Sequence, residues 1–264
     1  MMAPSETHLS ATMLDAKKIA FFKANGYLIL RDAIPAEDIH CANEMLWELL
    51  PPNFERSKPE TWTGEVTDCC KTQDLEKRRG RVKYRNCLWN NKRIYDIVAS
   101  NTMIREAIGQ LIGDFAEPER IRGLYPTFPT RSPKPGAYPG HADKHIFQVG
   151  VIGYLSDVDK NCGATSVYPG SHRILYHANE KELERSPKPE IYEREIANLS
   201  TQKPVELTAR AGSAILYHYR LFHGASYNLS NRIREAILGD FCCKNKEFIA
   251  LQPTQQNMWS HWKI

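Results

Sequence analysis

Two side chains that suit a metal ion lie two residues apart in the stretch GHADKH: His141 and Asp143. In a β-strand, side chains at positions i and i+2 leave the same face, so both can reach one small cation. An imidazole and a carboxylate are two of the three ligands of a 2-His-1-carboxylate site, which suits non-haem Fe(II) and leaves positions open for chemistry. The third ligand must be a distant histidine, and His223, 82 residues after His141, is the best candidate.

Other histidines compete for that role. His145 extends the pattern to H-x-D-x-H, and it is a candidate ligand, a contact to the ligands or the substrate, or a residue that only lines the pocket. His218 and His223 differ by five positions, so on one strand only one of them can face inward. The small Gly224 allows close backbone approach beside His223, which favours His223. His172 lies in a Pro-Gly-Ser-His turn, and we expect it to be structural.

An arginine follows His223 by eleven residues, at the start of the apolar run IREAIL. Arginine is rarely buried unpaired, and the planar fork of Arg234 can hold a carboxylate with two parallel hydrogen bonds. Such a clamp suits a diacid co-substrate whose other end chelates the metal. The alternatives are a structural salt bridge from Arg234 to Glu235 or Asp240, and a clamp formed by Arg232 instead.

Composition limits the class of protein. The chain has 264 residues, 42% hydrophobic and 10% aromatic, which is enough to bury a sizeable core and argues against wholesale disorder. The net charge of +4 is spread along the chain and is too small to indicate nucleic-acid binding. No apolar run approaches the roughly 18 residues of a membrane span, and the N-terminus lacks the apolar core of a signal peptide. We therefore expect a soluble, cytoplasmic protein without a nucleic-acid or membrane partner.

The seven cysteines support a reducing compartment. Their number is odd, and no C-x2-C pair is present for a zinc cage. Free thiols are therefore the expected state.

The elements that must position these residues can be predicted from periodicity and turn signals. Helical spacing predicts helices over 14–24, from Pro35 to about Leu50, and over 94–111, whereas 53–81 reads as loop. Strands are predicted at 27–30, 146–155, 164–168, several between 204 and 224, and 233–243. Residues 120–140 begin as a strand and become a Pro- and Gly-rich loop. Many short strands after helices indicate a mainly β fold with flanking helices, a β-sandwich or jelly roll.

The ordered motifs resemble one family. The chain contains, in this order, H-x-D, GATSVYPGSHR, His-Gly and an arginine eleven residues after that histidine. This ordered set resembles the phytanoyl-CoA dioxygenase (PhyH) family, as does the opening FFKANGYLILRDAIPAEDI. The resemblance covers about residues 15 to 245. It implies an Fe(II)- and 2-oxoglutarate-dependent oxygenase on a double-stranded β-helix, a cupin-like jelly roll. We expect one domain over residues 1–264, with a helical lead-in at 14–50, a jelly-roll core at about 120–250 and a polar external insertion at 174–203.

The resemblance also implies roles for individual residues. His141, Asp143 and His223 would bind iron, and Arg234 would bind the distal carboxylate of 2-oxoglutarate, with Thr165 as a further contact. The residue after His141 is alanine, where the family often has glutamine; on a strand it points away from the metal. The implied cofactors are Fe(II), 2-oxoglutarate and O2, with ascorbate as reductant and succinate and CO2 as products. Because Asp143 is a carboxylate, hydroxylation is favoured over halogenation, while desaturation, epoxidation and ring formation stay open.

The sequence indicates a small-molecule substrate without identifying it, and it leaves the oligomeric state open. Aromatic side chains are candidates either for an apolar pocket or for plain core: Tyr125, Phe128, Tyr138, Phe147 and Tyr154. Basic side chains are candidates either for contacts to an anionic substrate or for surface charge: Arg122, Lys134 and Lys144. Two other classes of function remain: a metal-dependent hydrolase or isomerase, against which Arg234 argues, and a catalytically silent ligand-binding protein.

Overall fold

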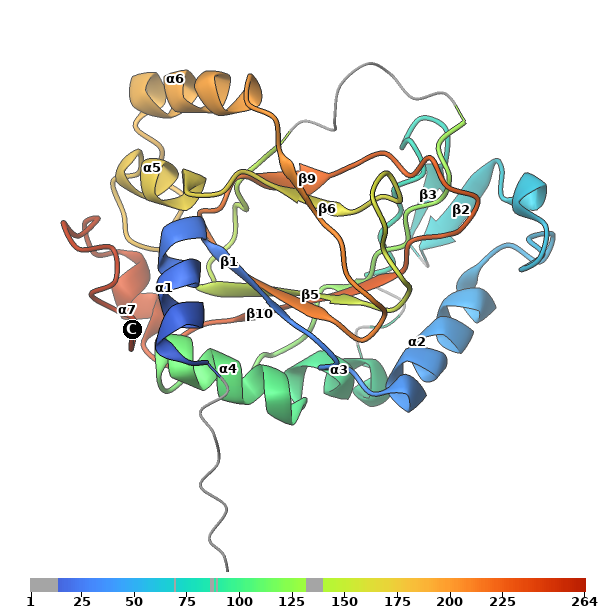
Figure 1. Cartoon of the computed structure of the whole chain (residues 1–264), viewed down its shortest axis with the longest axis horizontal. Helices are drawn as coiled ribbons and strands as arrows, with labels where there is room; N and C mark the ends of the chain where they lie inside the picture. Colours follow the sequence, from blue (N-terminus) through green and yellow to red (C-terminus); the bar gives the residue numbers. More distant parts are fainter. Residues whose placement is uncertain (1–13, 69, 86–87, 89, 132–139) are drawn as a thin grey trace, which may run out of the picture.

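The computed structural model describes residues 14–68, 70–85, 88, 90–131 and 140–264. Within these residues, the core consists of a five-stranded and a three-stranded antiparallel sheet that face each other (Figure 1). The larger sheet has the order β1 (Tyr27–Leu30), β8 (Ala214–His218), β5 (Val149–Tyr154), β10 (Ala236–Phe241) and β4 (Gly123–Leu124). The smaller sheet has the order β7 (Val205–Leu207), β6 (Thr165–Val167) and β9 (His223–Ala225). The predicted mainly β fold with a double-stranded β-helix is confirmed.

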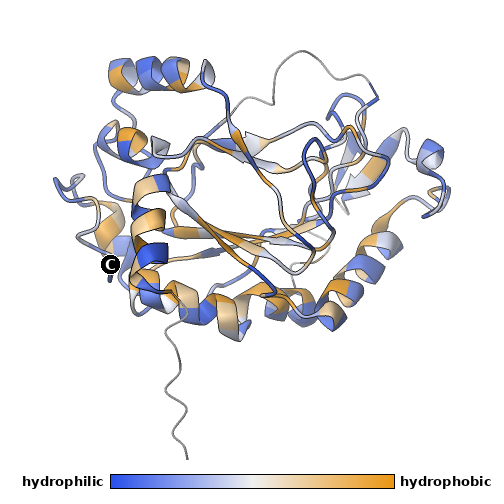
Figure 2. Cartoon of the chain, viewed as in Figure 1, coloured by the Kyte–Doolittle hydropathy of each residue, from blue (hydrophilic) through white to orange (hydrophobic). Residues whose placement is uncertain are grey.

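The central strand of the larger sheet is β5, which is buried along its whole length. The β-branched and aromatic residues of β5 suit a strand that is covered on both faces. Figure 2 shows apolar residues along the strands of the larger sheet. β5 pairs with β10 on one side and with β8 on the other. On β8, Tyr217 lies directly opposite Gly150, and a side chain at position 150 would overlap the Tyr217 ring. Glycine is therefore needed at this position for the tyrosine to lie across β5.

Helices cover the outer face of the larger sheet (Figure 1). α3 (Lys92–Ala99) and α4 (Thr102–Ile112) replace the single helix predicted over 94–111. The helix is interrupted because the Asn101 side chain accepts a hydrogen bond from the Ile104 amide and donates one to the Ala33 carbonyl, which makes Asn101 an N-cap. Val98 of α3 packs directly on Gly239 of β10, where a larger residue would clash.

The N-terminal elements agree with prediction. α1 (Ala16–Asn25) begins at Asp15, whose carboxylate accepts from the Lys18 amide, and ends at Gly26 with φ of 80°. α2 (Ala36–Leu49) follows Pro35. Between these helices, β1 joins the larger sheet as an edge strand paired with β8.

Three segments differ from prediction. The predicted loop at 53–81 contains a 3-10 helix (Pro59–Thr61) and a hairpin of β2 (Glu65–Asp68) and β3 (Lys71–Asp74). The predicted PGSHR turn starts α5 (Ser171–His177). The predicted external insertion contains α6 (Pro189–Ser200), whose Tyr192 and Leu199 form a buried cluster with residues that include Ala142 and Phe222. The insertion therefore shares a buried apolar cluster with Ala142, the residue between His141 and Asp143.

The chain ends after α7 (Lys246–Ala250) in a segment whose Trp259 and Trp262 pack on Phe22 of α1. Among the described residues, no helix combines the length and apolar character needed to cross a membrane.

Candidate metal centre

The structure brings His141, Asp143 and His223 together. One ligand atom from each lies within 4.8 Å of the other two. Nε2 of His141 is 3.8 Å from Oδ1 of Asp143, and Nε2 of His223 is 3.8 Å from Oδ2. The predicted strand over residues 141–145 is wrong, because His141 forms only an isolated bridge and Asp143 lies in irregular backbone. That bridge pairs His141 with His223 through reciprocal backbone hydrogen bonds of 2.8 and 2.9 Å, so both histidines are held by the same pairing.

His223 is the best buried and most strongly oriented of the three. It begins β9, and its Nδ1 lies 2.9 Å from the Leu221 carbonyl. A ring nitrogen facing a carbonyl must carry the proton, which leaves Nε2 with a free lone pair directed at Asp143. A histidine that donates its second N–H to a backbone carbonyl is the usual arrangement of a metal ligand.

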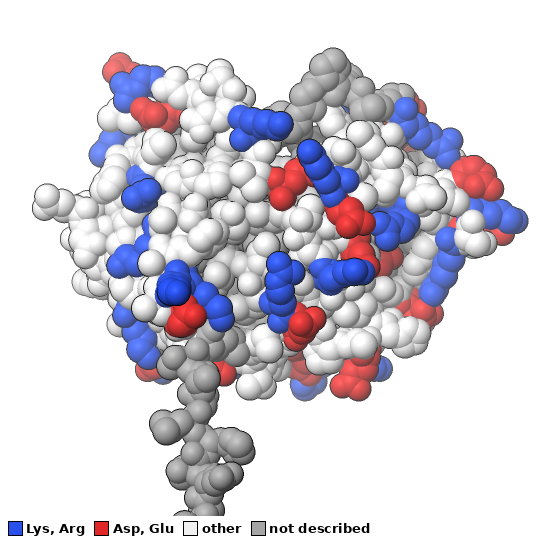
Figure 3. Space-filling view, viewed as in Figure 1, with Lys and Arg blue, Asp and Glu red and all other residues white. Residues whose placement is uncertain are grey.

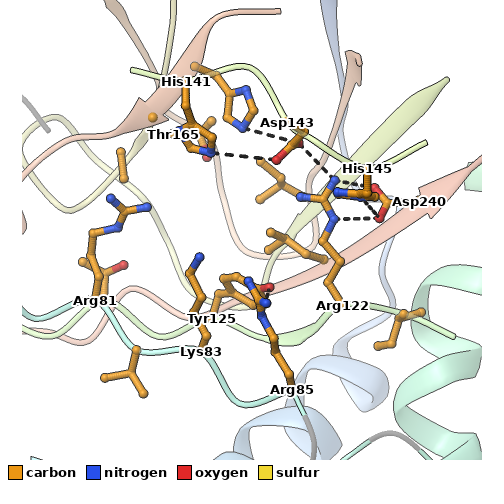
Figure 4. A pocket seen from close by; sticks show the side chains of 18 of the residues that line it. Arg81, Lys83, Arg85, Arg122, Tyr125, His141, Asp143, His145, Thr165 and Asp240 are labelled. Carbon is orange, nitrogen blue, oxygen red and sulfur yellow. Dashed lines mark hydrogen bonds and ion pairs between the residues drawn. The ribbon is translucent and has the colours of Figure 1, made fainter. Parts of the chain in front are cut away.

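Asp143 is held by two donors on one oxygen. Oδ2 accepts from the Tyr217 hydroxyl at 2.8 Å and from Nη2 of Arg122 at 3.0 Å. The tyrosine reaches the carboxylate because Gly150 leaves room for its ring. Figure 4 shows Arg122 between two carboxylates, those of Asp143 and Asp240. The arrangement leaves Oδ1 of Asp143 facing His141.

The protonation states of the three groups suit a cation. Burial lowers the pKa of His141 to about 3, and the neighbouring His223 adds to this effect. Burial likewise lowers the pKa of His223. Burial alone would raise the pKa of Asp143, but the charges of His223 and Arg122 outweigh it and hold that pKa below its usual range. Two neutral imidazoles and one anionic carboxylate are thus the stable forms near neutral pH, and this donor set fits Fe(II).

The competing histidines lie elsewhere. Nε2 of His145 is 2.8 Å from Oδ2 of Asp240, so His145 contacts the partner of Arg122 rather than the cluster. The prediction that His218 and His223 share one strand is wrong, because β8 ends at His218 and β9 begins at His223. His218 is buried among aromatic rings, stacked on Trp262 at 5.0 Å. His172 lies against His218 at 5.1 Å, in the first turn of α5.

Arg234 lies at one end of the cavity that holds the cluster. The cavity has a volume of about 690 Å³, and Arg234 and Thr165 both line it. The guanidinium is fixed by Nε donating to the Gly163 carbonyl at 2.8 Å and Nη1 donating to the Tyr125 carbonyl at 3.2 Å. Burial lowers the pKa of Arg234 to about 10, so it stays positively charged at neutral pH.

The described residues show neither of the two alternatives to a carboxylate clamp by Arg234. Among the described residues, no ion pair joins Arg234 to Glu235 or Asp240, and Asp240 is paired with Arg122 instead. Arg232, the rival, is largely exposed and forms a 3.0 Å ion pair with Asp159. A buried, backbone-anchored cation with no acidic partner therefore faces the cavity.

Several residues proposed from the sequence as substrate contacts have other positions. Phe128, Phe147 and Tyr154 are buried in the core and do not line the cavity, whereas Tyr125 does. Arg122 is engaged by Asp143 and Asp240, and Lys144 lines the cavity. Tyr138 and Lys134 lie outside the described residues.

Sequence reasoning missed four of the basic residues that line the cavity: Arg81, Lys83, Arg85 and Arg120. Of the described residues, seven lysine and arginine side chains line it against two acidic ones: Arg81, Lys83, Arg85, Arg120, Arg122, Lys144 and Arg234, with Asp143 and Asp240. The signal that could have found part of this set is the alternation RVKYR at 81–85. It also missed Tyr217 and Asp240, which fix the ligands indirectly.

An antiparallel double-stranded β-helix that gathers two histidines and one aspartate in a cavity defines a mononuclear non-haem metal enzyme. The phytanoyl-CoA dioxygenase (PhyH) family pattern matches residues 22–236. The chain belongs to this family, and it is an Fe(II)- and 2-oxoglutarate-dependent dioxygenase. No curated protein matches the sequence.

Several solved structures have a similar fold. EctD from S. alaskensis, with 2-oxoglutarate and 5-hydroxyectoine, has a TM-score of 0.58 at 18% identity, covering 90% of this chain and 79% of its own. SnoK, an alpha-ketoglutarate-dependent carbocyclase from nogalamycin biosynthesis, has a TM-score of 0.54 at 16% identity, covering 94% and 95%. HygX from Streptomyces hygroscopicus, with nickel and 2-oxoglutarate, has a TM-score of 0.53 at 14% identity, covering 88% of each chain. At these identities the likeness concerns the fold.

Proposed function

We propose that His141, Asp143 and His223 bind the Fe(II) ion of this dioxygenase, and that the enzyme hydroxylates a C–H bond of a small molecule. The observation that carries the assignment is the convergence of these three donors, with one ligand atom from each within 4.8 Å of the others. The reciprocal backbone bonds between the histidines and the orientation of His223 by the Leu221 carbonyl support it.

Arg234 and Thr165 are assigned to 2-oxoglutarate. The co-substrate has two carboxylates, one of which must be held away from the metal. Arg234 offers a buried positive charge whose Nε and Nη1 are tied to backbone carbonyls, so Nη2 is left to face the cavity. A desolvated guanidinium is a strong carboxylate ligand because little water competes with it.

The chain's own contribution to the reaction is binding and orientation. Bound Fe(II) with 2-oxoglutarate and O2 supplies the oxidant, while 2-oxoglutarate is converted to succinate and CO2. Arg122 and Tyr217 occupy Oδ2 of Asp143, which directs Oδ1 toward the metal position. Ile152 and Leu238 project from the larger sheet into the cavity and keep part of its wall apolar, which limits water beside the reacting carbon. The presence of a carboxylate at Asp143 favours hydroxylation.

The size of the cavity supports a small-molecule substrate. Its volume of about 690 Å³ lies within the usual range of ligand pockets, about 300 to 1,000 Å³. The EctD structure contains 5-hydroxyectoine, a small organic molecule. We therefore place the substrate of this enzyme among small molecules.

The assignment of residues is tested by succinate formation. Anaerobically iron-loaded protein receives 2-oxoglutarate and ascorbate, then O2. We expect slow succinate release from the wild type without any added substrate, loss of release in Asp143→Ala, and a much higher 2-oxoglutarate requirement in Arg234→Ala. Arg232→Ala is the matched control, because it removes an exposed arginine two residues away that is paired with Asp159.

Two results would contradict these assignments. Unchanged 2-oxoglutarate dependence in Arg234→Ala would remove that residue from the co-substrate site. Absence of both succinate and the Fe(II)–2-oxoglutarate charge-transfer absorbance in the wild type would contradict the proposed ligands.

A further inference from the structure

One wall of the cavity is a short extended segment, residues 81–85, that runs antiparallel to the chain around β4. The Val82 amide donates to the Pro126 carbonyl at 3.1 Å, and the Tyr84 amide donates to the Leu124 carbonyl at 2.8 Å. Alternate side chains of an extended chain share a face. Tyr84 is accordingly buried in the core, whereas Arg81, Lys83 and Arg85 line the cavity across from His141 and Asp143 (Figure 4).

Positive charge is concentrated in this cavity. With histidines neutral, its described lining carries five more positive than negative charges, while the whole chain carries a net charge of +4. The residues of the chain other than this described lining therefore carry a net charge of only −1, from +4 less +5. On the face drawn in Figure 3, acidic side chains lie among the basic ones. A cavity that holds the net charge of the molecule is suited to an anionic ligand.

Binding of the metal and the co-substrate together does not neutralise this charge. The two charges of a bound Fe(II) ion and the two carboxylates of 2-oxoglutarate cancel, so the excess remains when both are bound. The positive charge of Arg81 adds to the lowering of the pKa of Arg234, which burial mainly causes, so Arg81 lies near the residue proposed to bind the co-substrate. Lys83 and Arg85 lie further along the segment.

Tyr125 holds Lys83 and Arg85 side by side. Nζ of Lys83 lies 5.6 Å from the centroid of the Tyr125 ring, and the Arg85 guanidinium carbon lies 5.8 Å from the same centroid. Nε of Arg85 also donates to the Tyr125 hydroxyl at 2.9 Å. Within the described residues, the two side chains are thus positioned together without an ion pair to a carboxylate.

Lys83 has no carboxylate partner within hydrogen-bond or ion-pair distance among the described residues, although it is half-buried. Burial lowers the pKa of Lys83 to about 8, and the charges of Arg85 and Arg81 add to that effect. Placing the like charge of the exposed Arg85 beside the half-buried Lys83 is unfavourable in the free protein. An oxyanion between the two side chains would reverse this repulsion and form charge-assisted hydrogen bonds with both.

We propose that the substrate of this dioxygenase carries a compact oxyanion, a phosphate, phosphonate or carboxylate group, that binds between Lys83 and Arg85. The inference rests on the proposed function, since it places the substrate in the cavity of the iron ligands. The anion would be bound across the cavity from His141 and Asp143. The carbon that is oxidised therefore belongs to the opposite end of the substrate from its charged group.

The test is calorimetric and does not require turnover. Anaerobic protein loaded with Fe(II) and saturated with 2-oxoglutarate is titrated with methylphosphonate, inorganic phosphate and acetate. We expect saturable binding of one anion per chain, weakened about tenfold in Lys83→Met and in Arg85→Met, since a hydrogen bond to a charged group is lost. Lys83→Arg should retain binding. Lys203→Met, which removes an exposed lysine outside the cavity, should bind as the wild type does.

The charge-transfer absorbance, measured as 2-oxoglutarate is added, separates this proposal from the function on which it rests. We expect every variant to keep the wild-type affinity for 2-oxoglutarate. Weakened 2-oxoglutarate binding in Lys83→Met and Arg85→Met, with anion binding unchanged, would assign both residues to the co-substrate and overturn the proposal. A wild type that shows the absorbance but binds none of the three anions would overturn it as well, whereas loss of the absorbance in the wild type would contradict the iron site itself. Tighter binding of methylphosphonate and phosphate than of acetate would identify a phosphorus oxyanion, and the reverse order a carboxylate.

Discussion

Arg122 donates to Oδ2 of Asp143 at 3.0 Å while two further hydrogen bonds, of 2.6 and 2.7 Å, join the same guanidinium to Asp240. One arginine therefore links a proposed iron ligand to a carboxylate on β10, 97 residues further along the chain. Nε2 of His145 lies 2.8 Å from Oδ2 of Asp240, the oxygen that also accepts from Nε of Arg122, which completes the network. Asp143 is oriented by this network as much as by its own backbone.

Removing Arg122 should weaken iron binding. We expect Arg122→Met to raise the Kd for Fe(II) by about 10- to 100-fold, the usual effect of losing a group that orients a metal ligand. Tyr217→Phe removes one hydrogen bond to the same oxygen and should have a smaller effect in the same direction. The affinity is measured by anaerobic competition with a chelating dye. An unchanged Kd in Arg122→Met would show that Asp143 is oriented without it; Arg232→Met serves as the control for loss of an arginine.

Metal binding near pH 6 should release few protons. Ordinary histidines have a pKa near 6.5 and lose a proton when a metal binds at that pH. Burial lowers the pKa of His141 to about 3, so His141 is already neutral at pH 6, and burial also lowers the pKa of His223, so less of it is protonated than of an ordinary histidine. Titrating Zn(II) into metal-free protein at pH 6, in buffers of different ionisation enthalpy, gives the number of protons released. A release approaching two protons would contradict the assigned charge states.

Gly150→Ala should destabilise the protein and displace Tyr217. The new methyl group would overlap the Tyr217 ring, and neither strand can move freely within the sheet. We expect a loss of about 1 to 3 kcal/mol in the free energy of unfolding, as for other overpacked positions. Urea denaturation provides the measurement. Gly109→Ala in α4 is the contrasting variant, because the nearest atom lies 4.0 Å away, and it should stabilise the helix by about 0.5 to 1 kcal/mol.

Glu235 should make stability depend on pH. Burial raises its pKa to about 7, against opposing effects of Arg56 and Trp47. When folding raises the pKa of an acid, the native state is favoured while that acid is protonated. The contribution of Glu235 to the free energy of unfolding is therefore complete below about pH 4.5 and is lost as the pH rises through 7. Glu235→Gln removes this loss. Relative to the wild type, we expect the variant to gain up to about 3 kcal/mol between pH 5 and pH 8.

Urea denaturation of metal-free protein at several pH values measures this difference. Other titrating groups, including His141 and His223, affect both proteins equally and cancel in the comparison. A constant difference between the two proteins from pH 5 to pH 8 would mean that Glu235 ionises normally in the folded state.

The fold, and the three side chains that meet in the cavity, could be predicted from the sequence because both depend on ordered local patterns. Apolar β-branched runs such as 149–154 are strands wherever they are buried, and the motifs around His141 and His223 indicated the family. The backbone conformation predicted for residues 141–145 was wrong, although the three predicted side chains do meet. His141 and Asp143 do not share a strand face, and they meet His223 because of an isolated bridge between distant segments.

What could not be predicted depends on contacts across the fold. The break before α4 comes from Asn101 bonding to Ala33, 68 residues away, and this contact leaves no mark on helical periodicity. The pairing of Arg122 with Asp240 required the register of β4 against β10. No element was predicted for residues 82–85, because their bonding partner, residues 124–127, is separated from them by two helices.

The concentration of charge described above also affects how fast a ligand arrives. The cavity carries the whole positive excess of the chain, while the rest of the molecule is close to neutral. Field lines from such a molecule converge on the mouth of the cavity, so an anion is drawn there from the surrounding solution. The association rate of an anionic ligand should therefore fall steeply as salt is added, because the Debye length shortens from about 30 Å at 0.01 M to about 10 Å at 0.1 M.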